Sequence, residues 1–203
     1  MKISKIAPLC KRAKRILLLD AEDGTQWAGD GTAAYPLLFM PRLNAETVIP
    51  AMSFTEGEGE KLLVRHEQMP DRFETEDLIT DEEDMGPALL VFEYYGRLME
   101  AYDIGEAGII FVPSEYLKPV RSCYDDVSLF IRGKRNNRYV AVKAGMMLMG
   151  IIIPTVFPPQ ELKPLTGTIG RVLEGCRMLI ERQEHGDEEL NLSIDPLTGE
   201  VIE

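Results

Sequence analysis

The chain has 203 residues, 45% of them hydrophobic and 28% charged, and its 22 Lys and Arg against 34 Asp and Glu give a formal net charge of −12. This length fits one domain or two small ones, with a core large enough to need no disulfide or metal staple. The composition excludes collagen-like, disulfide-scaffold and fully disordered proteins, and no run of about 18 apolar residues is present to span a membrane.

Residues 1–43 predict one helix followed by three strands. In Ser4–Arg15 the apolar residues recur at helical spacing, Ser4 is placed to cap the helix, and Pro8 falls in the first turn, where a missing amide hydrogen costs little. Glycine-containing turns then separate the expected strands. These strands are Ile16–Asp20, Thr25–Ala28 and Ala33–Met40.

Residues 44–107 form an insertion with a different character. Its first part, to Asp84, is acidic and interrupted by prolines and glycines, with one strand-like stretch at Lys61–His66, so we expect a solvated acidic loop. The second part, Met85–Ala101, carries apolar residues on one helical face and predicts a helix. The residues on that face are Leu89, Phe92, Tyr95, Leu98 and Met99.

Residues 108–157 repeat the element order of the first unit. A strand at Ile109–Val112 leads into a helix that Ser114 is placed to cap, and three more strands follow. These are Val127–Arg132, Arg138–Ala144 and Met146–Ile153. Two such units related by a twofold axis can join their sheets edge to edge and place both helices on one side. The predicted fold class is therefore α+β, with duplicated (β)αβββ units, antiparallel sheets and helices on one face.

Residues 158–203 lie outside the repeat and predict a C-terminal helix and an acidic tail. Gly167–Glu184 has apolar residues at helical spacing. Leu190–Glu203 is typical of either a small hairpin or a loose terminus.

Charge is segregated along the chain. Residues 1–20 carry six bases and one acid, and residues 114–143 carry seven bases and three acids. Residues 56–84 carry twelve acids and three bases, and residues 174–203 carry nine acids and two bases. A net negative charge opposes indiscriminate binding to nucleic acid, yet basic helices gathered on one face remain compatible with it. Solvated faces are the alternative explanation of the basic segments.

Cysteines and histidines exclude several chemistries. Cys10, Cys123 and Cys176 are far apart, which fits a reducing compartment, and neither His66 nor His185 has a ligand at zinc spacing. No P-loop, nucleophile elbow or dinucleotide fingerprint is present. The apolar run after the N-terminal bases is too short for a signal peptide. We therefore expect a cytoplasmic protein that is not an enzyme and needs no cofactor.

The repeated unit resembles the DNA sliding clamps, the family that includes the bacterial β subunit. The resemblance rests on Met1–Ser4 with the basic helix after it, on Trp27–Tyr35 with its Asp-Gly turn, and on the helix, hairpin and terminal strand within Tyr116–Pro154. It covers about half the chain. Clamp helices face the duplex and contact phosphates without reading bases, so the resemblance implies six DNA-binding residues here. They are Lys11, Arg12, Lys14, Arg15, Lys118 and Arg121.

Three functions follow as hypotheses. The first is a non-enzymatic clamp-like protein that binds double-stranded DNA without sequence preference, or a replication partner, through its basic helices, with oligomerisation needed if a ring forms. The second is a protein-interaction or assembly module of a mobile element that uses the same fold without nucleic acid. The third is an enzyme with an acidic metal site within residues 44–84, which lack the Asp-x-Asp-x-Asp-Gly order of a calcium loop.

Overall fold

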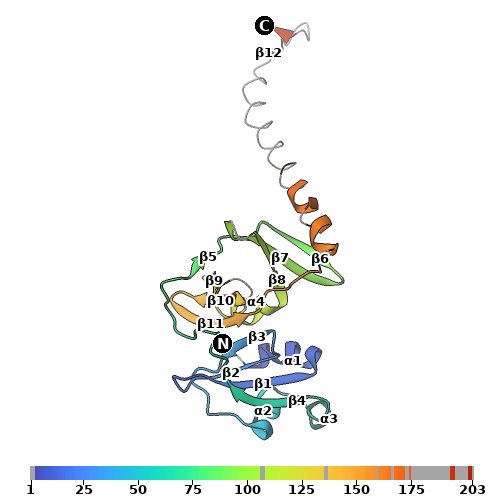
Figure 1. Ribbon diagram of the computed structural model, residues 1–203. Coiled ribbons are helices and arrows are strands. Elements are labelled where there is room, and N and C mark those ends of the chain that lie inside the picture. Colours follow the sequence, from blue (N-terminus) through green and yellow to red (C-terminus); the bar gives the residue numbers. More distant parts are fainter. Residues whose placement is uncertain are drawn as a thin grey trace. The chain divides into compact units, whose positions relative to one another are not determined.

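The computed structural model describes residues 3–105, 108–134, 137–158, 160–165, 167–171, 174, 193–194 and 201–202. The chain divides into two compact units, Met1–Val156 and Phe157–Glu203 (Figure 1). The first unit contains two sheets and the helices that pack on them, and it carries every residue that the sequence nominated for DNA binding.

The first unit begins with a short 3₁₀ turn, Ile3–Lys5, followed by helix α1 (Ala7–Ala13). The remaining helices are α2 (Ala45–Ala51), α3 (Glu56–Gly59) and α4 (Ser114–Arg121). The predicted helices at Ser4–Arg15 and from Ser114 are thus confirmed. Ser4 and Ser114 as caps are both wrong: Ile6 and Pro113 occupy the N-cap positions, and no side chain caps either helix.

Eight strands form one large sheet in the order β4-β1-β2-β3-β11-β10-β9-β5. Their bounds are β1 Arg15–Asp20, β2 Gln26–Gly29, β3 Ala33–Pro36, β4 Leu63–Gln68, β5 Glu83–Asp84, β9 Val127–Arg132, β10 Tyr139–Ala144 and β11 Met147–Ile152. Six of the seven strands predicted in the two units lie in this sheet, and the seventh, at Ile109–Val112, lies in a smaller sheet. The strand predicted at Ala33–Met40 is shorter than expected, because β3 ends at Pro36. At the centre β3 pairs antiparallel with β11, with Ala34 opposite Ile151.

The sheet is mixed, which corrects the prediction of purely antiparallel sheets. β4 lies parallel to β1, with Leu18 opposite His66, whereas every other pairing in this sheet is antiparallel. Parallel neighbours need a crossover connection, and the chain between β3 and β4 supplies one that contains α2 and α3. The acidic insertion, residues 44–107, therefore begins by completing one edge of the large sheet with β4.

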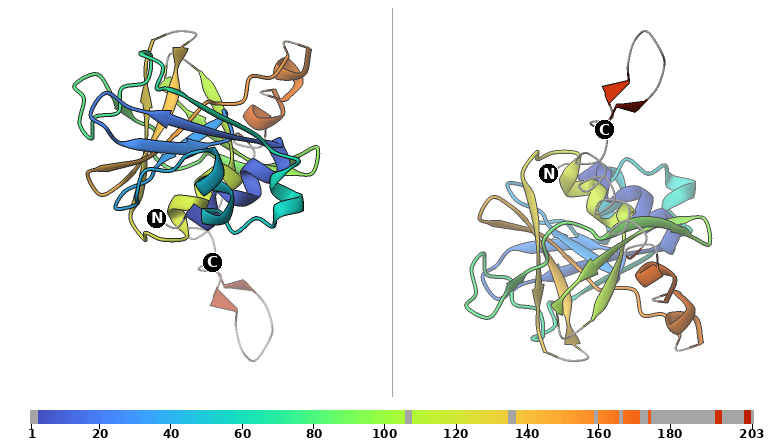
Figure 2. Two further views of the ribbon diagram at one scale, coloured as in Figure 1. Left: turned by 90° about the horizontal axis from the view of Figure 1, so that it is seen from below. Right: turned by 90° about the horizontal axis from the view of Figure 1, so that it is seen from above.

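Apolar residues cover both faces of the large sheet. Strand residues alternate between faces, so Ile16 and Leu18 pack under the helices while Leu17 and Leu19 point to the other side. Figure 2 shows α1 and α4 side by side on one face. The second face has its own smaller core around Trp27 and Tyr139, partly covered by the segment that contains Met69 and Phe73.

A second, three-stranded antiparallel sheet replaces the helix predicted at Met85–Ala101. Its strands are β6 (Leu90–Tyr94), β7 (Arg97–Asp103) and β8 (Ile109–Pro113), in the order β6-β7-β8. Tyr95 and Gly96 both have positive φ (47° and 73°), the geometry of a tight two-residue hairpin turn. The helix prediction is wrong because this Gly-containing turn interrupts the run, and Val, Phe and Tyr favour strands.

In the second unit, residues 160–165 and 167–171 are helical, and β12 (Ser193–Ile194) pairs antiparallel with β13 (Val201–Ile202). The strand pair supports the hairpin alternative for Leu190–Glu203. Most of the helix predicted at Gly167–Glu184 lies outside the described residues. Among the helices that the structure describes, none is long and apolar enough to cross a membrane.

Candidate nucleic-acid interface

Helix α1 presents its apolar residues to the core and its bases outward. Leu9 and Cys10 are buried, whereas Lys11 and Arg12 are exposed. Lys14 ends the helix in the left-handed conformation (φ 52°), and its amide donates to the carbonyls of Cys10 and Lys11. This cap turns the chain directly into β1 and leaves the Lys14 side chain exposed.

Helix α4 has the same division. Tyr116, Leu117 and Val120 are buried, while Lys118 and Arg121 point outward. Lys118 makes no ion pair within the described part of the chain. The two helices therefore place their apolar sides on one core and their bases on the outer surface.

A network of hydrogen bonds joins α1 to α4. The Tyr116 hydroxyl donates to Oδ2 of the buried Asp30 over 2.9 Å and accepts from Arg12 Nη2 over 3.2 Å. Arg12 also forms an ion pair with Glu115. Tyr35, from β3, donates its hydroxyl to the Tyr116 carbonyl over 2.6 Å. Side chains from residues 1–43 and from residues 108–157 are thus hydrogen-bonded to one another.

The Asp-Gly turn between β2 and β3 supports this network. Oδ1 of Asp30 accepts hydrogen bonds from the amides of Thr32 (2.9 Å) and Ala33 (3.1 Å). The Asp30 carbonyl accepts from Arg15 Nε over 2.8 Å. At Gly31, φ is +88°, a conformation that favours glycine, and an added Cβ would lie 2.4 Å from Arg15 Nη2, so the guanidinium would have to move. Arg15 is therefore occupied in holding the turn.

An open groove of about 790 Å³ lies between α1 and α4. Four bases and one carboxylate line it, so the groove is locally positive although the chain is acidic. The charged lining residues are Lys5, Arg12, Lys118, Arg121 and Glu115. Lys5, which was not among the nominated residues, is exposed. Its place in the basic N-terminal run was the only sequence signal for it.

Of the six nominated residues, the groove collects Arg12, Lys118 and Arg121. Lys11, Lys14 and Arg15 do not line it. Lys11 instead forms an ion pair with Glu58, Nζ to Oε1 over 2.6 Å. The hydrogen bonds from Lys11 and from Thr55 lower the pKa of Glu58 to about 2.

Arg121 forms an ion pair with a buried carboxylate, that of Glu100. Its Nη1 lies 2.7 Å from Oε1 of Glu100, and its Nη2 donates to the Tyr102 hydroxyl over 3.2 Å. Burial opposes ionisation of Glu100, but the hydrogen bonds from Arg121 and Tyr102 outweigh it and lower the pKa of Glu100. The guanidinium thus keeps one side against β7 and remains partly exposed towards the groove.

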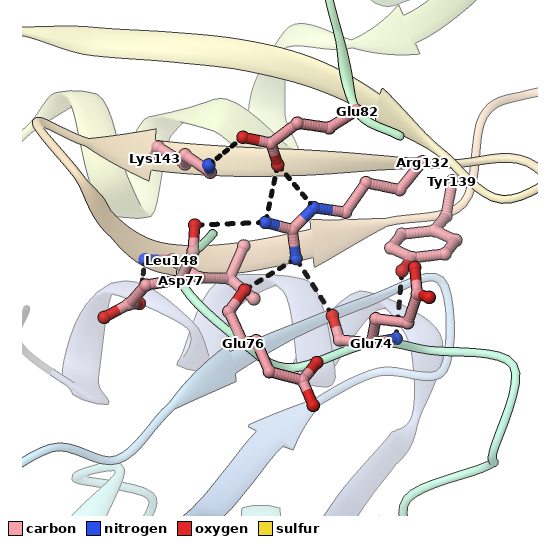
Figure 3. A network of polar contacts seen from close by, with 8 residues as sticks. All are labelled: Glu74, Glu76, Asp77, Glu82, Arg132, Tyr139, Lys143 and Leu148. Atoms are coloured by element: carbon pink, nitrogen blue, oxygen red, sulfur yellow. Dashed lines mark hydrogen bonds and ion pairs between the residues drawn. The ribbon is translucent and has the colours of Figure 1, made fainter. Parts of the chain in front are cut away.

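A second charged cluster lies on the opposite face of the sheet and was not predicted (Figure 3). Arg132 is 1% exposed and pairs with Glu82, Nη2 to Oε2 over 2.6 Å, while the buried Lys143 pairs with Oε1 of the same carboxylate. Arg132 also donates to the carbonyls of Glu74, Glu76 and Asp77.

Most acidic side chains of the insertion are exposed, as predicted, but this cluster corrects the expectation of a loose loop because it fixes the backbone. Figure 3 shows residues 74–82 held against β9 and β10 by one guanidinium. The side chain of Asp77 adds a hydrogen bond from the Leu148 amide over 2.7 Å. Among the described residues, no group of three or more His, Cys, Asp or Glu side chains is placed to hold a metal ion.

His66 is also more engaged than a lone surface histidine. Its Nε2 lies 2.8 Å from Oδ2 of Asp20, a buried carboxylate that Arg42 pairs with as well. Burial opposes ionisation of Asp20, but the hydrogen bonds from Arg42 and His66 outweigh it, so the pKa of Asp20 is lowered. The contact links β4 to β1 and has a structural role.

Comparisons with protein-family models, with curated proteins and with solved structures found no match to this chain. The resemblance to sliding clamps therefore stays a hypothesis, and the groove is judged on its own geometry.

Proposed function

We propose that this chain is a non-enzymatic, sliding-clamp-like protein that binds the backbone of double-stranded DNA through the groove between α1 and α4. The observation that carries the proposal is the gathering of Lys5, Arg12, Lys118 and Arg121 around one open groove in a chain of net charge −12. An acidic protein repels polyanions at long range, so a surface of this sign is best explained by a local anionic ligand.

The arrangement of elements supports the clamp-like part of the proposal. Each sequence repeat supplies one helix and three consecutive antiparallel strands, α1 with β1-β2-β3 and α4 with β9-β10-β11. The third strands, β3 and β11, pair antiparallel with each other. Such a join is what a twofold relation between two duplicated halves produces, because equivalent strands related by a twofold axis run in opposite directions.

Phosphate contacts by these bases predict a simple dependence on salt. Each neutralised phosphate contributes a slope of about −0.9 in the logarithm of affinity against the logarithm of salt concentration. Four contacting bases would give a slope of about −3.6, with no preference between sequences.

The experiment is a fluorescence-anisotropy titration of labelled duplex DNA between about 50 and 200 mM salt. The informative variant is Lys5→Glu with Lys118→Glu, because both side chains are exposed and neither forms an ion pair within the described part of the chain. We expect at least half of the salt slope to disappear without a change in melting temperature.

The control is Lys134→Glu, a single charge reversal at a base outside the groove, to be compared with Lys5→Glu and Lys118→Glu made singly as well as together. Lys134 is exposed and lies 3.9 Å from Asp81. It should leave the salt slope unchanged. Absence of DNA binding at low salt, or equal losses in the control and groove variants, would contradict the proposal.

A protein partner is the second candidate, favoured by the internal pairing of two groove bases. Arg12 is paired with Glu115 and Arg121 with Glu100, so part of the positive charge is already neutralised. An assembly module of a mobile element would bind an acidic protein segment here and retain no nucleic acid. A pull-down with and without nuclease distinguishes the two, since only the DNA-dependent complex is lost.

A further inference from the structure

Phe39 is an exposed aromatic side chain on a strained backbone. Its side chain is fully exposed, with a relative accessibility of 104%, and its φ is +61°. A bulky residue seldom adopts positive φ, and such strain persists only where the surrounding structure enforces it. A polar residue or glycine would suit this exposed turn better for folding alone, so the phenylalanine needs another explanation.

The chain on either side of Phe39 is held firmly. Leu37 donates its amide to the Gln26 carbonyl over 2.7 Å. The buried side chain of Gln26 then accepts from the Leu43 amide over 2.7 Å and donates to the Leu43 carbonyl over 3.0 Å. Leu38 and Met40 pack against the main core. The ring is therefore presented on a turn fixed at both ends, which lowers the entropy lost on binding.

An apolar pocket of about 110 Å³ lies on the face of the sheet opposite α1 and α4. Its lining includes Leu17, Ala34, Met69, Phe73, Ile151 and Ile153. Leu17 and Ala34 are only partly buried, because the segment around Met69 and Phe73 covers the second core incompletely. Cavities of ~150 Å³ lined by such side chains hold a benzene ring, so an open pocket of this size can take most of a phenyl group.

We propose that Phe39 of one molecule inserts into this apolar pocket of a second copy of the chain. The chain itself carries an exposed apolar ring on a turn fixed at both ends, and the pocket can take most of that ring. Phe39 follows the end of β3 at Pro36, whereas the pocket lies around Ala33 and Ala34 at its beginning. We infer a heterologous contact, in which one ring enters one pocket, so a pair of molecules keeps one free pocket and one free ring for further copies.

This inference is independent of DNA binding, because neither surface includes a residue of the basic groove. A heterologous contact continues from copy to copy, as a ring if the rotation closes and as an open filament if it does not. The wild-type protein should therefore show a mass that rises with concentration in sedimentation velocity, over a range that covers dissociation constants from about 1 μM to 1 mM.

The first variant is Phe39→Asn, because asparagine tolerates positive φ and removes the exposed ring. We expect it to stay monomeric over the whole concentration range, with a melting temperature equal to or above that of the wild type. Tyr95→Asn is the matched control: Tyr95 is 85% exposed with φ 47°, in a different turn. It should associate as the wild type does.

The second variant, Ala34→Phe, fills the pocket from β3 and should also be monomeric alone. Mixing it with Phe39→Asn is decisive, because the mixture contains one intact ring and one intact pocket. We expect a 1:1 dimer and nothing larger. If the wild type is monomeric, if Phe39→Asn associates normally, or if the mixture gives only monomers while the wild type associates, the proposal fails.

A third measurement does not depend on the folding of Ala34→Phe. A photo-crosslinking benzoylphenylalanine in place of Phe39 should form intermolecular crosslinks, and mass spectrometry should place them at Met69, Phe73 or Ile153. Crosslinks confined to other surfaces of the second copy would overturn the assignment of the pocket.

Discussion

Two pairs of bases from the same basic stretch of sequence, residues 114–143, have opposite environments. Lys118 and Arg121 line an open groove, whereas Arg132 and Lys143 are buried on the other face of the sheet and share one carboxylate. A base on the outer side of a helix can meet a ligand, while a base that a strand directs into the interior needs an internal partner. Charge counted along the sequence does not distinguish the two.

The same difference between exposed and buried bases decides whether a substitution should affect ligand binding or folding stability. A buried ion pair is costly to break by removing one partner, because the other charge is left without compensation. An exposed base can be replaced with little effect on folding. Replacing members of each pair therefore tests the comparison directly.

The largest effect is expected for Arg132→Met. The change removes a guanidinium that holds Glu82 and three backbone carbonyls, so the free energy of unfolding should fall by about 3–5 kcal/mol. Urea unfolding followed by the fluorescence of Trp27, the only tryptophan and 2% exposed, measures it. Lys134→Met, at an exposed base two residues away, should change stability by less than about 0.5 kcal/mol. Similar losses of stability in Arg132→Met and Lys134→Met would contradict the distinction between buried and exposed bases.

The next largest loss of stability is expected at the hydrogen bond between Tyr116 and Asp30, which helps to hold the two groove helices together. Tyr116→Phe leaves Oδ2 of the buried Asp30 without its hydroxyl donor, so stability should fall by about 1–3 kcal/mol. Because the same hydroxyl accepts from Arg12, the DNA binding that we propose should also weaken. Tyr95→Phe, at an exposed tyrosine, is the control and should change neither. A Tyr116→Phe protein as stable as the wild type would show that this hydrogen bond contributes little to folding.

The buried cluster should couple folding to pH. Burial opposes ionisation of Glu82, but the hydrogen bonds from Lys143 and Arg132 outweigh it and lower its pKa below 4.5. A carboxyl group whose pKa is lower in the folded state stabilises the fold above its unfolded pKa, and this contribution is lost as pH falls through the folded pKa.

Glu82→Gln should therefore flatten the decline in the urea midpoint as pH falls from 7 to below 4.5. The slope should shrink without vanishing, because the pKa values of Asp20 and Glu100 are lowered in the same direction. Glu76→Gln, an exposed neighbour whose backbone alone contacts Arg132, should keep the wild-type decline. If the urea midpoints of the wild type, Glu82→Gln and Glu76→Gln decline in parallel as pH falls, the assignment of this pH dependence to Glu82 is wrong.

Local periodicity predicted most of the fold. Ile16–Asp20, Val127–Arg132 and their neighbours have the residue types of strands between clear turns, and the structure confirms them. Met85–Ala101 failed because its apolar residues fit a helical and an alternating pattern at once. Gly96, in the middle of that run, was the signal for a turn.

The candidate site was predictable only in part, because pairing partners come from distant parts of the sequence. Nothing near Arg132 indicates that Glu82, 50 positions away, will accompany it into the interior. Likewise the Asp-Gly turn at Asp30 was recognisable, but its hydrogen bond to Tyr116 spans 86 positions. Which bases remain open to a ligand is decided by such contacts.

The smallest effect is expected for a surface ion pair, that of the exposed Lys11 with the partly exposed Glu58. Lys11→Met should raise the pKa of Glu58 from about 2 towards 4.5, because the strongest hydrogen bond to its carboxylate is lost. The rise should be incomplete, since the Thr55 amide and hydroxyl still donate to Oε2 over 3.0 Å. NMR titration of the Glu58 carboxyl carbon measures the shift, with Lys61→Met as the control. Because salt screens exposed charges, the free energy of unfolding should hardly change. A large loss of stability would mean that this surface pair contributes as much to folding as the buried pairs of Glu82 do.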